Sequence, residues 1–334
     1  MRILIWHVHG GWMDSFVQGR HDYLIPANAQ RDAWGLGRGG RNWPASAIEV
    51  PTEALRGEEI DAVVLQRPEE IAEVARLTGR VPGRELPAIY LEHNTPKAGN
   101  VPDSLHPLSG NRQIPIVHVT HFNELFWDCG EARTEVIEHG IVDPGHLYTG
   151  TSPTLGVAIN EPVRRWRVTG TDLLPRFAAI APLEVYGIGT EKLPAALGLD
   201  PDRLLIRGDL SPAGLRAALP QARAYLHPFR WTSLGLALLE AMHMGMPVLA
   251  LGATEAFRAV PPEAGAISSD VGELTAAAQL MLHEPAEAAA RGRAARRFAL
   301  QHYSLDRFLA DWDRLLGQLP TSNHIKAMRE GFIS

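Results

Sequence analysis

The sequence contains a single cysteine, few lysines and no long apolar run, and each scarcity excludes a class of protein. Cys129 is the only cysteine among 334 residues, so no intrachain disulfide can form, which is typical of reducing compartments. No stretch reaches the roughly 18 consecutive apolar residues of a membrane span. The apolar run at the N-terminus is too short for a signal peptide. We therefore expect a cytoplasmic protein in which Cys129 is a passive thiol.

The charge pattern argues against a nucleic-acid partner. The formal net charge is −6, and the sequence has no basic block of the kind that binds a phosphate backbone or an anionic lipid surface. Lysine occurs only at positions 97, 192 and 326, so nearly all basic side chains are arginines. Arginine is suited to phosphates and carboxylates, although a GC-rich genome produces the same bias. Peripheral contact with a membrane stays open.

The pattern of apolar runs predicts an α/β fold with two domains. A chain of 334 residues fits two domains at about 100–200 residues each. Short apolar runs alternate with helix-like stretches, which is typical of parallel βαβ units. In the first half, we expect strands over 2–8, 61–66, 87–93, 114–120 and 134–140; in the second half, over 155–160, 182–188, 203–208, 222–228 and 246–252. The main expected helices are 68–79, 121–130, 171–181, 211–219, 271–283, 285–303 and 304–319.

Two stretches between these runs are expected to be irregular. Residues 27–45 are rich in Gly, Asn and Arg and have no apolar period, which indicates a loop. The Pro- and Gly-containing stretch 143–153 is the expected linker between the two domains. Ligands of open parallel sheets bind at the carboxyl ends of strands, so the residues at those ends are the candidates for function.

In the first half, glycines and histidines follow the expected strands. Gly10 and Gly11 permit a tight turn and the close approach of a ligand, but the pair is no G-x-G-x-x-G fingerprint, which disfavours hydride transfer. The histidines at or near strand ends are His7, His9, His93, His118 and His121. Their spacing matches no zinc pattern, so we expect no metal. His93 is the clearest candidate, because a histidine there can donate to a hydroxyl or an anionic oxygen.

In the second half, an arginine cluster follows an expected strand. Arg164, Arg165 and Arg167 precede a helix and could aim guanidinium groups at a diphosphate, although a solvated basic loop has the same composition. Gly187, which follows the next expected strand, marks a further point of close approach.

The stretch HPFRWTSLGLALLEAMHMG predicts a strand end, a turn and a helix that starts near Ser233 or Leu234. Free N–H groups and the dipole at the start of a helix favour an anion, and Thr232 and Ser233 can cap the helix or bind phosphate oxygens. Glu240 lies in the middle of this apolar helix. Because an unpaired carboxylate near a core is costly, we expect a ligand hydroxyl pair or an arginine beside Glu240.

At these residues the chain resembles the family 4 glycosyltransferases of group 1 type. The segment TSLGLALLEAMHMGMPVLA matches their C-terminal motif at Gly235, Leu236, Leu238, Leu239, Glu240, Ala241, Met242, Gly245, Pro247, Val248 and Ala250. VIEHGIVDP, GGWMDSF and GAISSDVGELTAAAQLML resemble further family segments in the same order. The resemblance implies the GT-B architecture, with two Rossmann-like βαβ domains facing a central cleft, and a retaining transfer from a nucleotide-diphosphate sugar.

The resemblance also implies roles for individual residues. Glu240 would hold the ribose hydroxyls, and His93 would lie near the donor sugar. Thr232 stands where the family has another Glu that contacts the transferred sugar, which is a departure from the motif. We expect catalytic roles for His93, Arg164 and Arg167. The residues expected to bind the nucleotide sugar are Gly10, Gly11, Arg165, Gly187, Thr232, Ser233, Leu234, Gly235 and Glu240.

The resulting hypothesis is a hexosyltransferase-type enzyme without a cofactor or a metal. Its donor would be a nucleotide sugar such as a UDP- or GDP-sugar, and its acceptor a hydroxyl of a glycan, a lipid-linked molecule or a small molecule. The expected domains are an acceptor-side domain over 1–147, a nucleotide-sugar domain over 148–310, and a helix and tail over 311–334 that cross back to the first domain. Two alternatives stay open: a nucleotide-sugar-binding protein without transferase activity, and a nucleotide-sugar epimerase.

Overall fold

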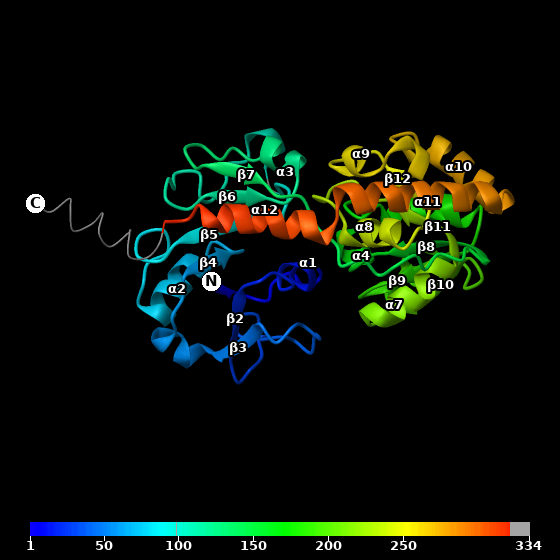
Figure 1. Ribbon diagram of the computed structural model, residues 1–334. Helices are drawn as coiled ribbons and strands as arrows, with labels where there is room; N and C mark the ends of the chain where they lie inside the picture. Colours follow the sequence, from blue (N-terminus) through cyan, green and yellow to red (C-terminus); the bar gives the residue numbers. More distant parts are fainter. Residues whose placement is uncertain (98, 321–334) are drawn as a thin grey trace, which may run out of the picture. The chain divides into compact units, whose positions relative to one another are not determined.

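The computed structural model describes residues 1–97 and 99–320, which form two compact α/β units (Figure 1). Of the described residues, the N-terminal unit comprises Met1–Gly140 and residues 305–320, and the C-terminal unit comprises Ile141–Ser304. The boundaries expected from the sequence were residues 147 and 310. Residues 321–334 of the expected tail lie outside the described residues.

The N-terminal unit is built on a seven-stranded sheet with the order β3-β2-β1-β4-β5-β6-β7. Every pairing in this sheet is parallel. The strands are β1 (Arg2–Ile5), β2 (Asp22–Ala27), β3 (Ala47–Pro51), β4 (Ala62–Leu65), β5 (Ala88–Glu92), β6 (Ile116–His118) and β7 (Thr134–Val136). Its α-helices are α1 (Gly10–Phe16), α2 (Glu70–Thr78), α3 (His121–Phe126) and α12 (Leu305–Gly317).

The C-terminal unit is built on a six-stranded sheet with the order β10-β9-β8-β11-β12-β13, again with parallel pairing throughout. The strands are β8 (Ser152–Ala158), β9 (Leu183–Tyr186), β10 (Leu204–Gly208), β11 (Ala222–His227), β12 (Val248–Leu251) and β13 (Gly265–Ser268). Its α-helices are α4 (Pro162–Arg165), α5 (Leu174–Ala178), α6 (Leu193–Leu197), α7 (Pro212–Ala218), α8 (Leu236–His243), α9 (Ala256–Ala259), α10 (Val271–His283) and α11 (Pro285–His302).

The expected strands are all present, and three further strands were missed. Strands β4 and β12 are buried along their whole length, as apolar runs between two layers of helices must be. β2 and β3 were missed because Pro26 and Pro51 interrupt their apolar pattern, and proline in a run argues against a strand. β13, the third, is short and only partly buried.

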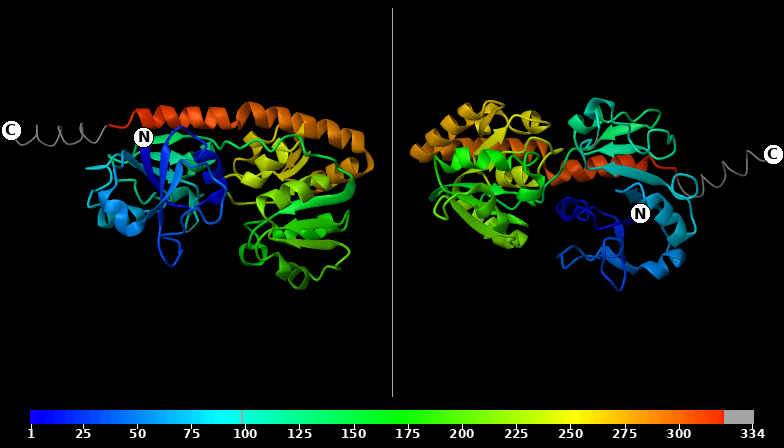
Figure 2. Two further views of the ribbon diagram at one scale, coloured as in Figure 1. Left: turned by 60° about the horizontal axis from the view of Figure 1, so that its bottom comes forward. Right: turned by 180° about the vertical axis from the view of Figure 1, so that it is seen from behind.

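Helix α12 follows the C-terminal unit in the chain but packs in the N-terminal unit (red in Figure 2). Its apolar stripe buries Phe308 and Trp312. The ring of Trp312 lies 5.6 Å from that of Trp12 and 5.0 Å from that of Phe16, both on α1. Burial of a large apolar side chain contributes about 1.5–3 kcal/mol, so the last helix is part of the core of the first unit.

In each sheet the chain reverses its direction of winding between two neighbouring strands. This switch point lies between β1 and β4 in the N-terminal unit and between β8 and β11 in the C-terminal unit. Neighbouring connections leave such a point on opposite faces of the sheet, which opens a crevice at the carboxyl ends of the strands. The residues after β1, β4, β8 and β11 therefore lie where a ligand would bind.

A tight packing contact of α11 generates a prediction about stability. A Cβ atom added at the buried Gly292 would lie 2.0 Å from the carbonyl oxygen of Gly245. Alanine is the better helix former by about 1 kcal/mol, yet a clash with backbone cannot be relieved by a side-chain rotation. We expect Gly292→Ala to lower the free energy of unfolding by about 1–3 kcal/mol, as measured by urea denaturation.

Gly317→Ala is the control for this prediction. Gly317 also lies in a helix, but a Cβ added there would meet nothing within 4 Å. This variant should unfold at the same urea concentration as the wild type or at a higher one. Equal losses of stability in both variants would contradict the packing argument.

Candidate functional site

The loops after β8, β9 and β11 pack closely against one another in the C-terminal unit. Gly170 has φ +70°, and a Cβ there would lie 1.9 Å from the carbonyl oxygen of Pro228, which follows β11. Gly187 has φ +125°, and a Cβ there would lie 2.3 Å from the carbonyl oxygen of Ile159, which follows β8. The close approach expected at Gly187 is thus made to the protein's own backbone.

The three arginines between β8 and α5 have different surroundings. Arg164 and Arg167 have side chains that are about 70% exposed, and they pair with Glu161 at 3.5 Å and Asp172 at 3.1 Å. Arg165 is different, because burial and the charge of Arg164 lower its pKa, and its guanidinium lies 6.0 Å from the ring centre of Phe229. Of the three, Arg165 is the arginine in a desolvated setting.

The backbone of this arginine segment is strained on both sides of α4. Glu161 has φ +54° and Trp166 has φ +35°, a region that non-glycine residues rarely adopt. Thr171 stabilises the segment by donating to the carbonyl oxygen of Pro162 at 2.8 Å. Backbone strain of this kind persists only where the surrounding structure compensates for it, and it clusters at functional sites.

Helix α8 begins later than expected. Its first residue is Leu236 and its N-cap is Gly235, so Ser233 and Leu234, predicted at the start of the helix, lie in the preceding loop with Thr232. The physical reason is burial: the Leu234 side chain enters the hydrophobic core, which leaves only its backbone for a ligand. Gly235 is required here because a Cβ would lie 2.7 Å from the His227 ring.

Glu240 is a half-buried carboxylate on α8, whose buried residues are four apolar side chains and His243. Leu238, Leu239, Ala241 and Met242 around it are fully buried. The Glu240 charge acts on Tyr225 of β11, whose pKa is raised by burial first and by Glu240 second. The carboxylate therefore lies at the inner side of α8, close to the sheet.

In the N-terminal unit, Gly10 and Gly11 form the start of α1 and not the tight turn predicted from the sequence. His9 is the N-cap, and the helix continues to Phe16. Gly10 leaves room for the Arg41 guanidinium, which a Cβ would approach to 2.4 Å. Arg41 is held there by an ion pair with Asp14 of α1.

The structure brings two of the five candidate histidines into contact. The ring centres of His9 and His93 are 4.0 Å apart. Burial, and to a smaller degree the neighbouring His9 and His139, lower the pKa of His93 well below its usual value. Burial also lowers the pKa of His9 to about 4. Both imidazoles are consequently neutral at physiological pH.

The other three histidines lie apart from this pair. His7 shares a hydrogen bond of 2.9 Å with the carbonyl oxygen of Gly37, and His121 is exposed at the start of α3. His118 is buried with its Nε2 at 3.4 Å from the Cys129 sulfur. Burial raises the pKa of Cys129 to about 11, so this cysteine is an inert thiol, consistent with the expectation from the sequence.

Within residues 1–97 and 99–320, no three His, Cys, Asp or Glu side chains are grouped as a metal ion would need them. In the same part of the chain, none of the helices combines the length and the apolar content that crossing a bilayer requires.

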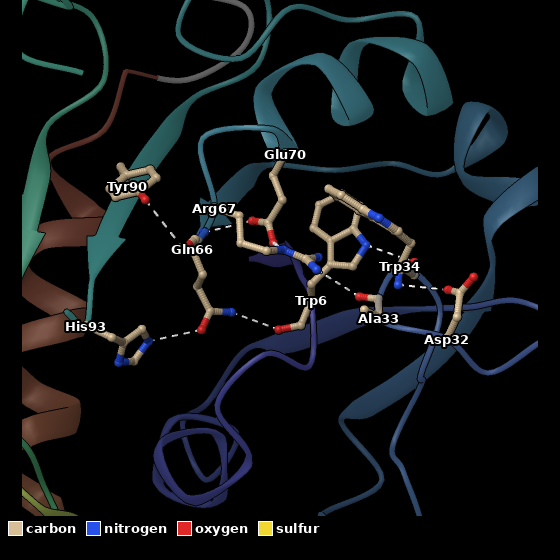
Figure 3. Close-up of polar contacts among 9 residues, drawn as sticks. All are labelled: Trp6, Asp32, Ala33, Trp34, Gln66, Arg67, Glu70, Tyr90 and His93. Carbon is tan, nitrogen blue, oxygen red and sulfur yellow. Dashed lines mark hydrogen bonds and ion pairs between the residues drawn. The ribbon is translucent and has the colours of Figure 1, made fainter. Parts of the chain in front are cut away.

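The sequence reasoning missed a polar cluster at the switch point of the first sheet (Figure 3). Gln66 follows β4, is 4% exposed, and makes hydrogen bonds to Trp6 and His93. Arg67 lies beside it with its guanidinium 4.0 Å above the Trp34 ring. A polar residue after an apolar strand was the available signal, but a lone glutamine has no recognisable motif.

Comparisons with known proteins agree with the C-terminal geometry. Residues 171–284 match the family model for glycosyl transferases group 1. This segment contains β9 to β13, α8 and Glu240. The match supports a group 1 glycosyltransferase; the comparison with curated proteins gave no match.

Solved structures show the fold. HepE of Anabaena in complex with UDP has a TM-score of 0.71 at 13% identity, covering 96% of this chain and 100% of that one. Sucrose-phosphate synthase of Thermosynechococcus elongatus has a TM-score of 0.67 at 14% identity, covering 95% and 98%. A glycosyltransferase of Rickettsia africae has a TM-score of 0.66 at 14% identity, covering 94% and 97%. The expected α/β GT-B fold, with two parallel sheets, is confirmed.

The buried histidines predict how stability depends on pH. Burial lowers the pKa of His118 to about 3, whereas in the unfolded chain it is about 6.5. Below pH 6.5, His118 therefore binds a proton in the unfolded state but not in the folded state. The contribution of His118 to the free energy of unfolding is fully present above pH 6.5. As the pH falls toward 3, this contribution decreases by about 1.4 kcal/mol per pH unit.

His118→Gln tests this dependence, because glutamine retains a polar amide but does not titrate. Its free energy of unfolding should fall less steeply between pH 6 and 4 than that of the wild type, by about 1.4 kcal/mol per pH unit. Denaturant titrations at several pH values measure both slopes. Identical slopes would show that His118 can take a proton in the folded protein.

Proposed function

We propose that the protein is a retaining glycosyltransferase that transfers a hexose from a nucleotide-diphosphate sugar to a hydroxyl acceptor. The observation that carries the proposal is Glu240. It is a half-buried carboxylate on a helix whose buried residues are mostly apolar, within the segment that matches glycosyl transferases group 1. A carboxylate only accepts hydrogen bonds when ionised, so it suits the two hydroxyls of a ribose.

Arg165 is the residue proposed to bind the diphosphate. Its guanidinium is desolvated and has the charge of Arg164 beside it, so a bound anion would stabilise both. Arg164 and Arg167 are exposed and paired with carboxylates, which suits long-range attraction of the donor better than direct contact. The backbone around Ser233 and Gly235, before α8, is the second element proposed to face the phosphates.

In the proposed reaction, charge separates along the bond between the sugar and the diphosphate before the bond to the acceptor has formed to the same extent. Negative charge develops on the diphosphate, where the Arg165 guanidinium stabilises it. The acceptor hydroxyl attacks on the face from which the phosphate departs, and its proton passes to the departing phosphate oxygen. The configuration is retained without a protein nucleophile. His93 is proposed to contact the donor sugar.

The donor is identified by binding. HepE, which has the same fold, was solved with UDP, so a UDP-sugar is the first donor to test. A thermal-shift panel of UDP-, GDP-, ADP- and dTDP-sugars, followed by calorimetry on the best ligand, identifies the base. Mass spectrometry of products then separates transfer from epimerisation, because an epimerase converts the donor without an acceptor.

Glu240→Ala should weaken nucleotide binding by about 10- to 100-fold, the value of a hydrogen bond to a charged group. Calorimetry with the nucleotide measures the loss. The control is Glu287→Ala, which removes a carboxylate paired with Arg291 on α11 of the same unit. If Glu240→Ala binds the nucleotide as tightly as the control, the proposed ribose contact is wrong.

His93→Ala should lower kcat by about tenfold or more, while the affinity for the nucleotide alone changes little. The reason is that His93 belongs to the N-terminal unit and is proposed to contact the sugar, not the nucleotide. Steady-state kinetics and calorimetry together measure the two effects. A loss of nucleotide affinity with unchanged kcat would contradict this role.

One observation favours a second candidate function, a binding protein without transferase activity. Thr232 stands where the resembled motif has a Glu that contacts the transferred sugar. A threonine hydroxyl carries no charge, so this sugar contact would be weaker or absent. A protein that binds the nucleotide sugar tightly but neither transfers nor hydrolyses it, across the donor panel and a set of hydroxyl acceptors, would establish this alternative.

A further inference from the structure

A chain of hydrogen bonds crosses the switch point of the N-terminal sheet and ends on His93 (Figure 3). The side-chain amide of Gln66 has its Nε2 at 2.8 Å from the carbonyl oxygen of Trp6, the residue that follows β1. Its Oε1 lies 3.0 Å from Nε2 of His93, the residue that follows β5. One buried amide thus connects the ends of β1, β4 and β5.

The chemistry of the three groups allows one arrangement of protons. A carbonyl oxygen only accepts, so the group of Gln66 that faces Trp6 must be the NH2 group. Flipping the amide would place two acceptor oxygens against each other. The oxygen of Gln66 therefore faces His93, and the His93 nitrogen opposite it must donate. In a neutral imidazole the other ring nitrogen, Nδ1, then has no proton and is an acceptor.

Gln66 is itself held in place from both sides. Its backbone N–H donates to Glu70 at 2.7 Å, and the other carboxylate oxygen of Glu70 accepts from Arg67 at 2.7 Å. Arg67 in turn donates to the carbonyl oxygen of Ala33 at 3.0 Å and stacks on Trp34. The Trp34 carbonyl oxygen accepts from the Trp6 indole at 3.0 Å, which closes the ring of contacts.

We propose that Gln66 is a positioning residue that fixes His93 as the Nε2–H tautomer, so that in the proposed contact with the sugar Nδ1 of His93 accepts a hydrogen bond and does not donate one. This deepens the proposed function and rests on it for the identity of the substrate. It reverses the role expected from the sequence, in which His93 donates. An acceptor nitrogen orients a sugar hydroxyl, and its lone pair favours the positive charge that develops on a sugar as the diphosphate departs.

The tautomer is tested directly by NMR on the full chain with 15N-labelled histidine. Long-range correlations at neutral pH distinguish a protonated from an unprotonated ring nitrogen, and the His93 signals are assigned by their loss in His93→Phe. The expected result is a protonated Nε2 whose proton exchanges slowly with water, and an unprotonated Nδ1. A proton on Nδ1 in the wild type overturns the proposal.

The role of Gln66 is tested by two substitutions of similar size. Gln66→Met removes both hydrogen bonds and should make the Nε2 proton of His93 exchange faster, with kcat lowered by about tenfold and little change in nucleotide affinity. Gln66→Glu retains an acceptor opposite His93 but places its second oxygen against the Trp6 carbonyl oxygen, so it should restore the slow exchange only in part. If Gln66→Met leaves both the Nε2–H signal and kcat at their wild-type values, Gln66 does not position His93.

Thr78→Val is the matched control. The Thr78 hydroxyl donates to the carbonyl oxygen of Val74 at 2.7 Å and accepts from the backbone N–H of Arg80 at 3.1 Å, so its removal costs two hydrogen bonds in the same unit without contact to His93. Thermal melting should show a similar loss of stability for Thr78→Val and Gln66→Met. Only Gln66→Met should change the His93 spectrum and kcat; the same changes in both variants would make Gln66 a purely structural residue.

The His93 tautomer and the glycosyltransferase activity can be tested separately. The NMR experiment needs no donor, so a protein that transfers no sugar can still show the Nε2–H tautomer, in which case the proposed function fails and the positioning stands. If the protein transfers a sugar but His93 has its proton on Nδ1, the proposed function stands and the positioning by Gln66 fails. In that case His93 acts as a donor.

Discussion

Parallel strand pairing is the constraint on which the rest of the structure depends. Every pairing in both sheets is parallel, so all strands of a sheet end at one edge. β4 and β12 are buried along their whole length and carry only apolar side chains. The candidate polar groups of the site lie mostly beyond the strand ends, where the switch points separate the connecting helices. Gln66, His93 and the arginine segment before α5 all lie in such positions.

A second consequence of this arrangement is that the polar groups at the strand ends are partly desolvated. Burial keeps His9, His93 and His118 neutral, and it lowers the pKa of Arg165. Neutral imidazoles bind through hydrogen bonds whose direction depends on the tautomer, whereas a desolvated guanidinium favours an anion. The N-terminal unit thus offers directional hydrogen bonding, and the C-terminal unit offers charge and a half-buried carboxylate.

Much of the fold could be predicted from the sequence, and the failures have identifiable causes. The apolar central strands were recognised, and α10 has the bounds expected of it, because both patterns are local. β2 and β3 were missed because Pro26 and Pro51 break their apolar pattern. The start of α8 was placed too early, because the burial of Leu234 depends on the core and not on neighbouring residues.

The sequence by itself determined that the protein has two parallel α/β units and that Glu240 lies on an apolar helix within a glycosyltransferase-like motif. The two units are visible in apolar runs that repeat over short distances in the sequence. The motif around Glu240 is visible because it lies in one continuous segment. Only the tertiary structure decided that Arg165 is the desolvated arginine and that Gln66 meets Trp6 and His93. The physical reason is that Gln66 and His93 follow different strands, and hydrogen-bond direction is defined only once the parallel sheet has placed those strand ends side by side.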